Sequence, residues 1–206
     1  YYMANDNIGY MRVKKFGEHT YAEMLVALAE LGLKGMDGLI IDLRGDVGGY
    51  MHIAIQMANE FLPKGRLIVY TQGRKSPREE FRSDGRGSFQ SLPLVVLVDE
   101  GSASSSEIFA GAIQDNDRGT IVGRRTFGKG LVQQPIEFRD GSVVRLTVAR
   151  YYTPSGRCIQ KPYVKGHDEE YENELLARYE RGEFFSQDSI HQDGPSYKTR
   201  LGRTVY

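Results

Sequence analysis

The sequence predicts an α/β fold in which a largely parallel sheet is flanked by helices, followed by a C-terminal hairpin and a polar tail. Two apolar runs, 38–43 and 93–98, have the length of buried strands. Each run is followed by small residues and then by a stretch whose apolar residues recur at helical spacing. Because strands that alternate with helices usually lie parallel, we expect these runs to be neighbours in one sheet.

The other elements follow from the same two patterns. Short apolar runs predict further strands at 8–14, 67–71 and 120–122. Helical spacing predicts helices at 20–33 and 50–61, and a third helix after a serine-rich segment. The charged stretch 73–91 predicts a flexible surface loop, because it offers few apolar side chains for burial.

The second half of the chain predicts a hairpin and a short helix. Strands at 136–138 and 143–148 flank the dipeptide Asp140-Gly141, which is typical of a two-residue turn. A short helix is expected at 170–181, where charged and apolar residues alternate before Gly182.

Composition sets limits on the domain organisation and on the partners. At 206 residues the chain is long enough for a core, and we expect a core domain over 1–160 with a polar extension or insertion over 161–206 packed on it. The 27 Lys and Arg residues balance 27 Asp and Glu residues, so charge gives no argument for nucleic acid. No apolar run approaches the roughly 20 residues of a membrane span.

Cysteine and histidine usage predicts neither a disulfide nor a metal site. Cys158 is the one cysteine, and the histidines show no metal-ligand spacing. We therefore expect no metal and no cofactor.

The segment Gly101–Ala112 places a serine where a nucleophile would lie. It connects the strand at 93–98 to a helical pattern, and such a turn exposes a side-chain oxygen beside free backbone N–H groups. An equally supported interpretation is a helix cap, in which Ser104 or Ser105 caps the helix and Glu107 completes a capping box.

A lysine downstream favours the nucleophile. Gly128 and Gly130 flank Lys129, and strand periodicity places Gln133 on the same face as Lys129. A Ser–Lys pair is a known alternative to Ser–His–Asp, but the lysine must be neutral, so we expect it partly buried. The alternatives are an ordinary solvated lysine and, less favoured, a site that uses His52 as the base.

Three blocks in this order, 38–49, 101–115 and 123–133, resemble the protease core of C-terminal processing peptidases, also called tail-specific proteases. The segment 151–157 also fits, and the resemblance covers residues 8–159. The resemblance implies a crotonase-like layered fold. This sequence differs from the family's usual pattern at three positions. It has Asp46 and Val47 where Asn and Pro are usual, and Ser105 where Ala is usual.

The resemblance also implies roles for individual residues. It makes Ser104 the nucleophile, ahead of the neighbouring serines, with Lys129 as the base and Gln133 assisting the lysine. An oxyanion hole needs two N–H donors, and we expect them from Ser105 and from Gly48 or Gly49.

Asp115 is a further candidate by resemblance. It lies about three helical turns after Ser104, so it is too far along the axis to relay a proton. We expect a supporting, structural role for it, paired with Arg118, Arg124 or Arg125.

The expected function is that of a serine endopeptidase that cleaves proteins near their C-termini. The partners implied are protein or peptide substrates and their C-terminal tails, and the location implied is the periplasm or cell envelope. The PDZ-type domain usual in the family is expected to be absent from this chain, and the oligomeric state stays open. The alternatives are an inactive peptidase-like domain that binds peptides and a crotonase-like acyl-CoA enzyme.

Overall fold

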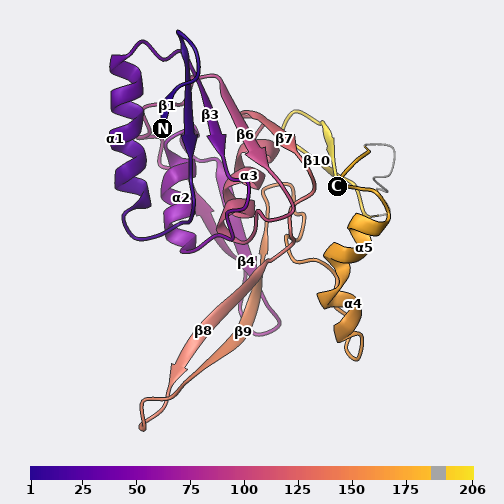
Figure 1. Cartoon of the computed structure of the whole chain (residues 1–206). Helices are drawn as coiled ribbons and strands as arrows, with labels where there is room; N and C mark the ends of the chain where they lie inside the picture. Colours follow the sequence, from indigo (N-terminus) through magenta and orange to yellow (C-terminus); the bar gives the residue numbers. More distant parts are fainter. Residues whose placement is uncertain (187–193) are drawn as a thin grey trace.

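The computed structural model describes residues 1–186 and 194–206, so His191 lies outside the described residues. The first sheet has the strand order β1-β2-β3-β6-β7 (Figure 1). Strands β2, β3, β6 and β7 are parallel, and β1 is an antiparallel edge strand. The strands are β1 Tyr2–Met3, β2 Ile8–Arg12, β3 Gly38–Asp42, β6 Leu94–Val98 and β7 Thr120–Gly123. The predicted α/β class with a parallel sheet is confirmed.

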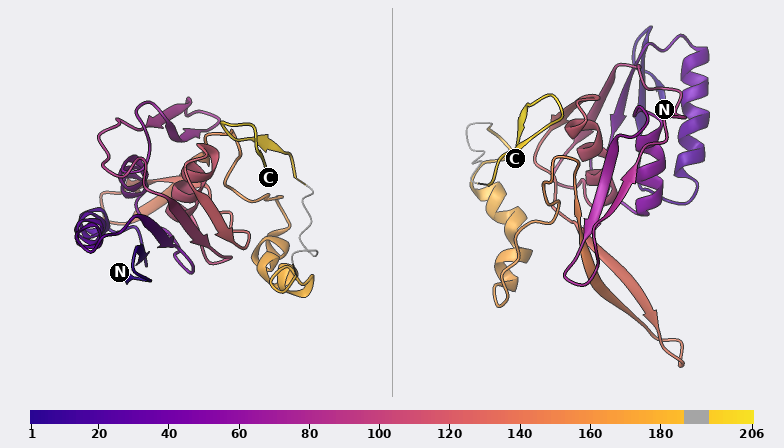
Figure 2. Two further views of the ribbon diagram at one scale, coloured as in Figure 1. Left: turned by 90° about the horizontal axis from the view of Figure 1, so that it is seen from above. Right: turned by 180° about the vertical axis from the view of Figure 1, so that it is seen from behind.

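Three helices connect these parallel strands: α1 Thr20–Leu33, α2 Met51–Asn59 and α3 Ser105–Asp115. The strand order runs in one direction, and right-handed crossovers then place all three helices on the same face of the sheet. Figure 2 shows this layer. Helix α2 lies in its middle, in contact with both α1 and α3. Helix α3 is buried on nearly every side, with Phe109 packed edge-on against Phe61. Within the described residues, no helix has the length and apolar character needed to cross a membrane.

A second, antiparallel sheet has the order β5-β4-β9-β8. Its strands are β4 Leu67–Gln72, β5 Glu79–Arg82, β8 Leu131–Glu137 and β9 Val143–Tyr152. Strand β4 packs against α2 and α3, on the side away from the parallel sheet (Figure 2). The predicted strand at 67–71 therefore exists, and it belongs to the antiparallel sheet.

Strand β5 lies inside the stretch 73–91, so the prediction of a loop there is wrong at Glu79–Arg82. The strand is charged because it is an edge strand, where charged side chains protect the free backbone groups from pairing with another chain. Glu80 forms ion pairs with both Arg78 and Arg82 on the exposed face. The recurrence of apolar residues, which indicates buried strands, does not detect an exposed, charged strand of this kind.

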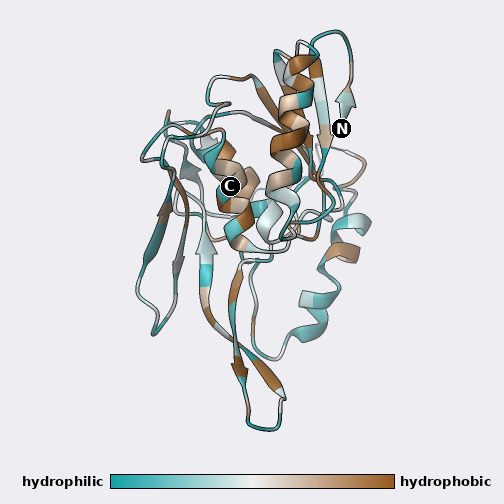
Figure 3. Ribbon diagram, turned by 90° about the vertical axis from the view of Figure 1, so that its left-hand side faces the viewer, coloured by the Kyte–Doolittle hydropathy of each residue, from teal (hydrophilic) through white to brown (hydrophobic). Residues whose placement is uncertain are grey.

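The predicted hairpin is confirmed but is longer than expected. Strand β8 pairs along its length with residues 143–150 of β9, and the two strands project away from the rest of the molecule (Figure 1). The connection spans residues 138–142 and is not a two-residue turn, with Gly141 at φ 83°. Apolar side chains remain about half exposed along the projecting part (Figure 3): Ile136, Phe138, Val143, Val144 and Leu146.

The C-terminal part carries two short helices, α4 Asp168–Glu172 and α5 Glu174–Glu180, in place of the predicted single helix. Strands β10 Tyr197–Lys198 and β11 Thr204–Val205 form a small antiparallel pair. This part touches the core at the far end of α3, where the amide of Arg200 donates to the carbonyl of Asp115 and Arg203 pairs with Asp117.

Candidate active site

Ser104 lies at the turn from β6 into α3, at the carboxyl edge of the parallel sheet. Its backbone has φ 56° and ψ −112°, a conformation that is costly for a residue with a side chain. Sharp strand-to-helix turns of this kind expose nucleophilic serines in other hydrolases. The side chain is half-buried, and its hydroxyl donates no hydrogen bond to a described residue.

The neighbouring serines have a different role. Ser102, Ser105 and Ser106 are buried, and each hydroxyl donates to a backbone carbonyl. The acceptors are Leu43, Gly49 and Asp46, at 2.8, 2.9 and 2.9 Å respectively. All three hydroxyls therefore tie the serine segment to the loop that follows β3, and Ser104 differs from them in having a hydroxyl free to react.

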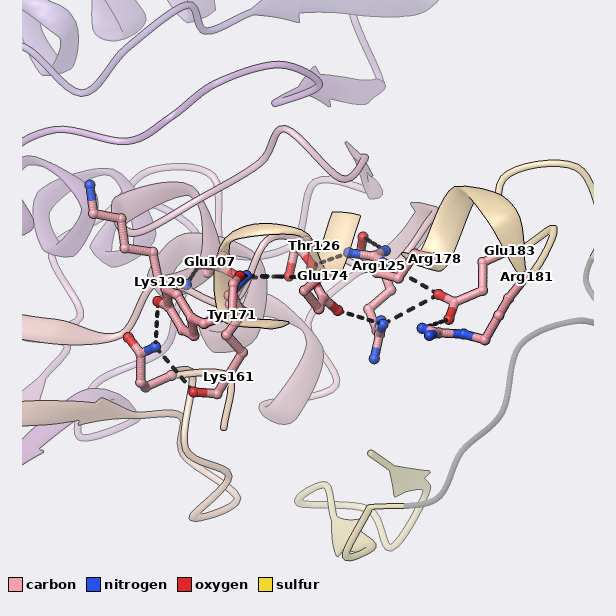
Figure 4. Close-up of polar contacts among 12 residues, drawn as sticks. Glu107, Arg125, Thr126, Lys129, Lys161, Tyr171, Glu174, Arg178, Arg181 and Glu183 are labelled. Carbon is pink, nitrogen blue, oxygen red and sulfur yellow. Dashed lines mark hydrogen bonds and ion pairs between the residues drawn. The ribbon is translucent and has the colours of Figure 1, made fainter. Parts of the chain in front are cut away.

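Glu107 connects the serine to the lysine segment (Figure 4). Its buried Oε2 accepts the backbone N–H groups of Ser104 and Lys129, both at 2.8 Å. Its Oε1 accepts the hydroxyl of Thr126 at 2.7 Å and the N–H of Gly128 at 2.6 Å. Burial raises the pKa of Glu107, and the four hydrogen bonds oppose this shift. One carboxylate thus holds the two segments side by side.

The local pattern at Glu107 predicts only a capping box. That box forms: Glu107 accepts the Ser104 N–H at 2.8 Å, and the Ser104 side chain faces the backbone N–H of Glu107. The contacts to Thr126, Gly128 and Lys129 were missed, since no local pattern reports a partner about 20 residues away.

Lys129 does not occupy the partly buried position that we expected. Its side chain is exposed and extends away from Glu107 (Figure 4). In the described structure its amine makes no hydrogen bond with the Ser104 hydroxyl. The fold therefore brings the two backbones together and leaves the two reactive side chains apart.

Gln133 lies on β8 with an exposed side chain that is not hydrogen bonded to Lys129. Strand β8 begins at Leu131, and a bulge interrupts its register between Val132 and Gln133. The simple alternation that placed Gln133 and Lys129 on one face does not apply across a bulge.

The two glycines that follow β3 differ in their availability as oxyanion donors. The Gly48 N–H donates to Asp46 Oδ1 at 2.8 Å, so it is already used. The N–H groups of Gly49 and Ser105 make no hydrogen bond within the described part of the chain. Gly48 has φ 96°, and a Cβ there would lie 2.6 Å from the Ala103 carbonyl, so this turn packs directly against the serine segment.

Asp115 is buried at the end of α3, and the predicted pairing with Arg118, Arg124 or Arg125 is wrong. Its Oδ2 accepts the Ser155 N–H at 3.1 Å, and its Oδ1 lies 3.5 Å from Arg157. Both partners belong to the turn after β9, a region that sequence spacing along α3 does not report.

His52 is exposed near the start of α2, where its ring lies against Tyr50 and forms no hydrogen bond with Ser104.

The comparisons with known proteins identify the family. The model of peptidase family S41 matches residues 7–169. The chain belongs to peptidase family S41. The family consists of serine peptidases, and the predicted resemblance to C-terminal processing peptidases is confirmed.

Several relatives are similar over about three quarters of the chain. The chain is 45% identical to the carboxyl-terminal-processing protease of Synechocystis over 75% of its own length and 36% of the relative's length. It is 40% identical to the chloroplastic C-terminal processing peptidase of Tetradesmus obliquus, covering 77% of the chain and 34% of that protein. The chain thus spans about a third of these relatives.

A solved structure shows the same fold. The photosystem II D1 C-terminal processing protease superposes with a TM-score of 0.70 at 40% identity, over 74% of this chain and 39% of that chain.

Asp46, where the resemblance leads us to expect Asn, is a buried carboxylic acid beside the site. It is 1% exposed, and its Oδ2 has no hydrogen-bond partner among the described residues. Burial raises the pKa of Asp46 to about 6, and the hydrogen bond from the Gly48 N–H opposes this shift only in part. Ionised Asp46 therefore destabilises the fold near neutral pH.

The replacement Asp46→Asn should become more favourable as the pH rises. The folded protein keeps a proton on Asp46 between about pH 4 and 6, which the unfolded chain releases, so ionisation lowers wild-type stability through this window. We expect the stability difference between variant and wild type to shift by about 2–3 kcal/mol in favour of Asn from pH 4 to pH 7.5. Urea unfolding at both pH values measures it.

The exposed Asp6→Asn provides the control and should show no such shift. A pH-independent difference for Asp46→Asn would contradict the buried, proton-retaining carboxyl.

The replacement Glu107→Gln should weaken both the fold and the site. The amide group would face N–H donors in place of one carboxylate oxygen, which we expect to cost about 1–3 kcal/mol of unfolding free energy. Thermal and urea unfolding measure this loss. Glu100→Gln is the matched control, because its exposed ion pair with Arg124 contributes at most about 1 kcal/mol. Equal effects of both replacements would contradict the role of Glu107.

Proposed function

We propose that this chain is the catalytic core of a serine endopeptidase that cleaves protein substrates near their C-termini. In this proposal Ser104 is the nucleophile and Lys129 the general base, with Gln133 assisting. The observation that carries the proposal is the Ser104 hydroxyl, which donates to no described acceptor and lies on a strained turn. The N–H of this turn shares the Glu107 carboxylate with the Lys129 N–H.

The reaction begins when Ser104 Oγ attacks the carbonyl carbon of the scissile peptide bond. Neutral Lys129 accepts the serine proton and later donates it to the departing amine, which leaves an acyl-enzyme. Water then attacks the ester, and Lys129 accepts a proton from it. Lys129 returns this proton to Ser104 Oγ as the ester bond breaks, which releases the acyl part of the substrate as a carboxylic acid. The exposed lysine stem must first rotate toward Ser104, a short movement because the two backbones already lie at one carboxylate.

The negative oxygen of each tetrahedral intermediate needs two N–H donors. The free N–H groups of Ser105 and Gly49 support their assignment to this role. Gly48 contributes in a different way, since its lack of a side chain lets the turn approach Ser104.

The printed names of the relatives support the choice of substrate. They are C-terminal processing proteases, and a protein or peptide with a free C-terminal tail is therefore the substrate class that we propose. On the same resemblance we propose a periplasmic or cell-envelope location, with 1–160 as the catalytic core and 161–206 as an extension packed on it. Family membership argues against an acyl-CoA enzyme.

Replacing the nucleophile should abolish cleavage and leave the fold intact. We expect Ser104→Ala in the full chain to lose several orders of magnitude in the rate of casein cleavage, and to lose labelling by a fluorophosphonate. Ser105→Ala is the control, because it keeps its N–H and loses one hydrogen bond of about 0.5–1.5 kcal/mol. Cleavage by Ser104→Ala, together with loss in Ser105→Ala, would mean that the wrong serine is assigned.

Replacing Lys129 should show whether catalysis needs its positive charge or its ability to accept a proton. Lys129→Arg keeps the positive charge, but a guanidinium does not deprotonate in this pH range, so it should be as inactive as Lys129→Ala. Gln133→Ala should lose less activity, since it removes an orienting group and not the base. Initial rates of peptide cleavage measure all three variants, and an active Lys129→Arg enzyme would exclude Lys129 as the base.

A further inference from the structure

Arg178 is a fully buried arginine in α5, outside the residues that the family model matches. Its NH2 group donates to the carbonyl of Arg125 at 2.6 Å, and its NH1 group donates to the carbonyl of Thr126 at 3.2 Å. Figure 4 shows Arg178 reaching from the C-terminal helix to this segment. Two hydrogen bonds from the C-terminal extension therefore hold the backbone of the loop that leads from β7 to Lys129.

The burial of this guanidinium is costly unless its donors are used. Burial lowers the pKa of Arg178, and Glu183, itself buried, accepts from its Nε at 3.1 Å. Each of the two terminal nitrogens donates to one carbonyl of the same loop. A fork of fixed geometry that binds two consecutive carbonyls holds their peptide planes in one orientation.

Thr126 connects these hydrogen bonds to the active site. Its carbonyl accepts from Arg178, and its hydroxyl donates to Glu107 Oε1 at 2.7 Å. Two residues later, the N–H groups of Gly128 and Lys129 reach the same carboxylate. By orienting Thr126, Arg178 therefore also helps to hold the Glu107 carboxylate, which in turn binds the Ser104 N–H.

The far end of the segment is held from the same side. The N–H of Lys161 donates to the Gly128 carbonyl at 2.9 Å, and Gln160 accepts the Gly130 N–H at 3.0 Å. Lys161 is in turn anchored to α4 and α5, with its amine 2.9 Å from the Tyr171 carbonyl and 3.5 Å from Glu174.

We propose that Arg178 is a positioning residue for the general base: it fixes the Arg125–Lys129 backbone beside the Ser104 turn, the place from which the Lys129 side chain rotates toward Ser104. This inference rests on the proposed role of Lys129. It gives the C-terminal extension a function in the reaction itself, through the geometry of the lysine loop and without contact with the substrate.

The test compares Arg178→Met with Arg181→Met in the full chain. Arg181 is a matched control, since it forms an ion pair with the same Glu183 at 3.0 Å but is half exposed and forms no hydrogen bond with the lysine loop in the described structure. We expect Arg178→Met to lower kcat by about 10–100-fold with KM within about twofold, because a misplaced base affects the chemical step. Arg181→Met should retain the wild-type kcat.

A conservative variant and hydrogen exchange separate positioning from general destabilisation. Arg178→Lys keeps the charge but offers a point donor in place of the fork, so it should restore kcat in part. Hydrogen exchange should become faster at the amides of Phe127, Gly128 and Lys129 in Arg178→Met, with the amides of α1 unchanged. If Arg178→Met does not fold, Arg178→Lys carries both measurements.

Two results would overturn the inference. One is wild-type kcat with unchanged exchange of the loop amides, and the other is a uniform increase in exchange across the molecule. Failure of the proposed function looks different: the wild-type chain would neither cleave casein nor react with a fluorophosphonate. In that case, faster hydrogen exchange confined to the loop amides of Arg178→Met would still show that Arg178 holds this loop. Unchanged exchange of these amides would overturn that role.

Discussion

The carboxylate of Glu107 is the interaction on which the arrangement of the site depends. It joins the first turn of α3 to the loop after β7, next to the hydrogen bond that the Phe127 N–H donates to the Ser102 carbonyl at 3.0 Å. Removing a carboxylate from water is unfavourable, and four donors offset that cost in this case. The strained conformation of Ser104 persists because its N–H is held by a charged partner that the helix itself keeps in place.

The parallel sheet makes this junction possible. The carboxyl ends of neighbouring parallel strands lie at one edge, so the loops after β3, β6 and β7 meet there. The loop after β3 supplies Gly48 and Gly49, the loop after β6 supplies Ser104, and the loop after β7 supplies Lys129. Hydroxyl groups of buried serines close the first two loops onto each other, and Glu107 adds the third.

Periodicity in the sequence was sufficient for the elements that have a buried face. The parallel strands and α1 to α3 were predicted near their observed positions because burial imposes a pattern on them. The charged edge strand β5 was not predicted, because it lacks a pattern of buried residues. The sheet to which β4 belongs was not predicted either, since periodicity indicates that one face of a strand is buried but not which element packs against that face.

The site was predicted to the level of residue choice and not of geometry. The motifs placed Ser104 and Lys129 in adjacent segments, and those roles stay predictions. The exposure of the lysine and the capture of the Gly48 N–H by Asp46 arise from contacts between separate loops. Such contacts form only when the loops after β3, β6 and β7 come together at the carboxyl edge of the sheet. No single stretch of sequence encodes this arrangement.

The glycines around Lys129 also have a different physical role from the one their flexibility suggests. A Cβ at Gly123 would overlap the Val98 carbonyl, and a Cβ at Gly130 would overlap the Gln160 amide. Close packing, and not freedom of movement, therefore explains these two positions, and moving the loop would break several hydrogen bonds at once.

The remaining freedom lies in the side chain of Lys129. Its backbone N–H is fixed at Glu107, while its stem is solvated and rotates among staggered conformers on a picosecond-to-nanosecond timescale. In the proposed mechanism, torsions of this one side chain bring the amine to the Ser104 hydroxyl, with the loop remaining as it is. A substrate that covers the lysine would favour the conformers turned inward, because it excludes the water that stabilises the outward ones.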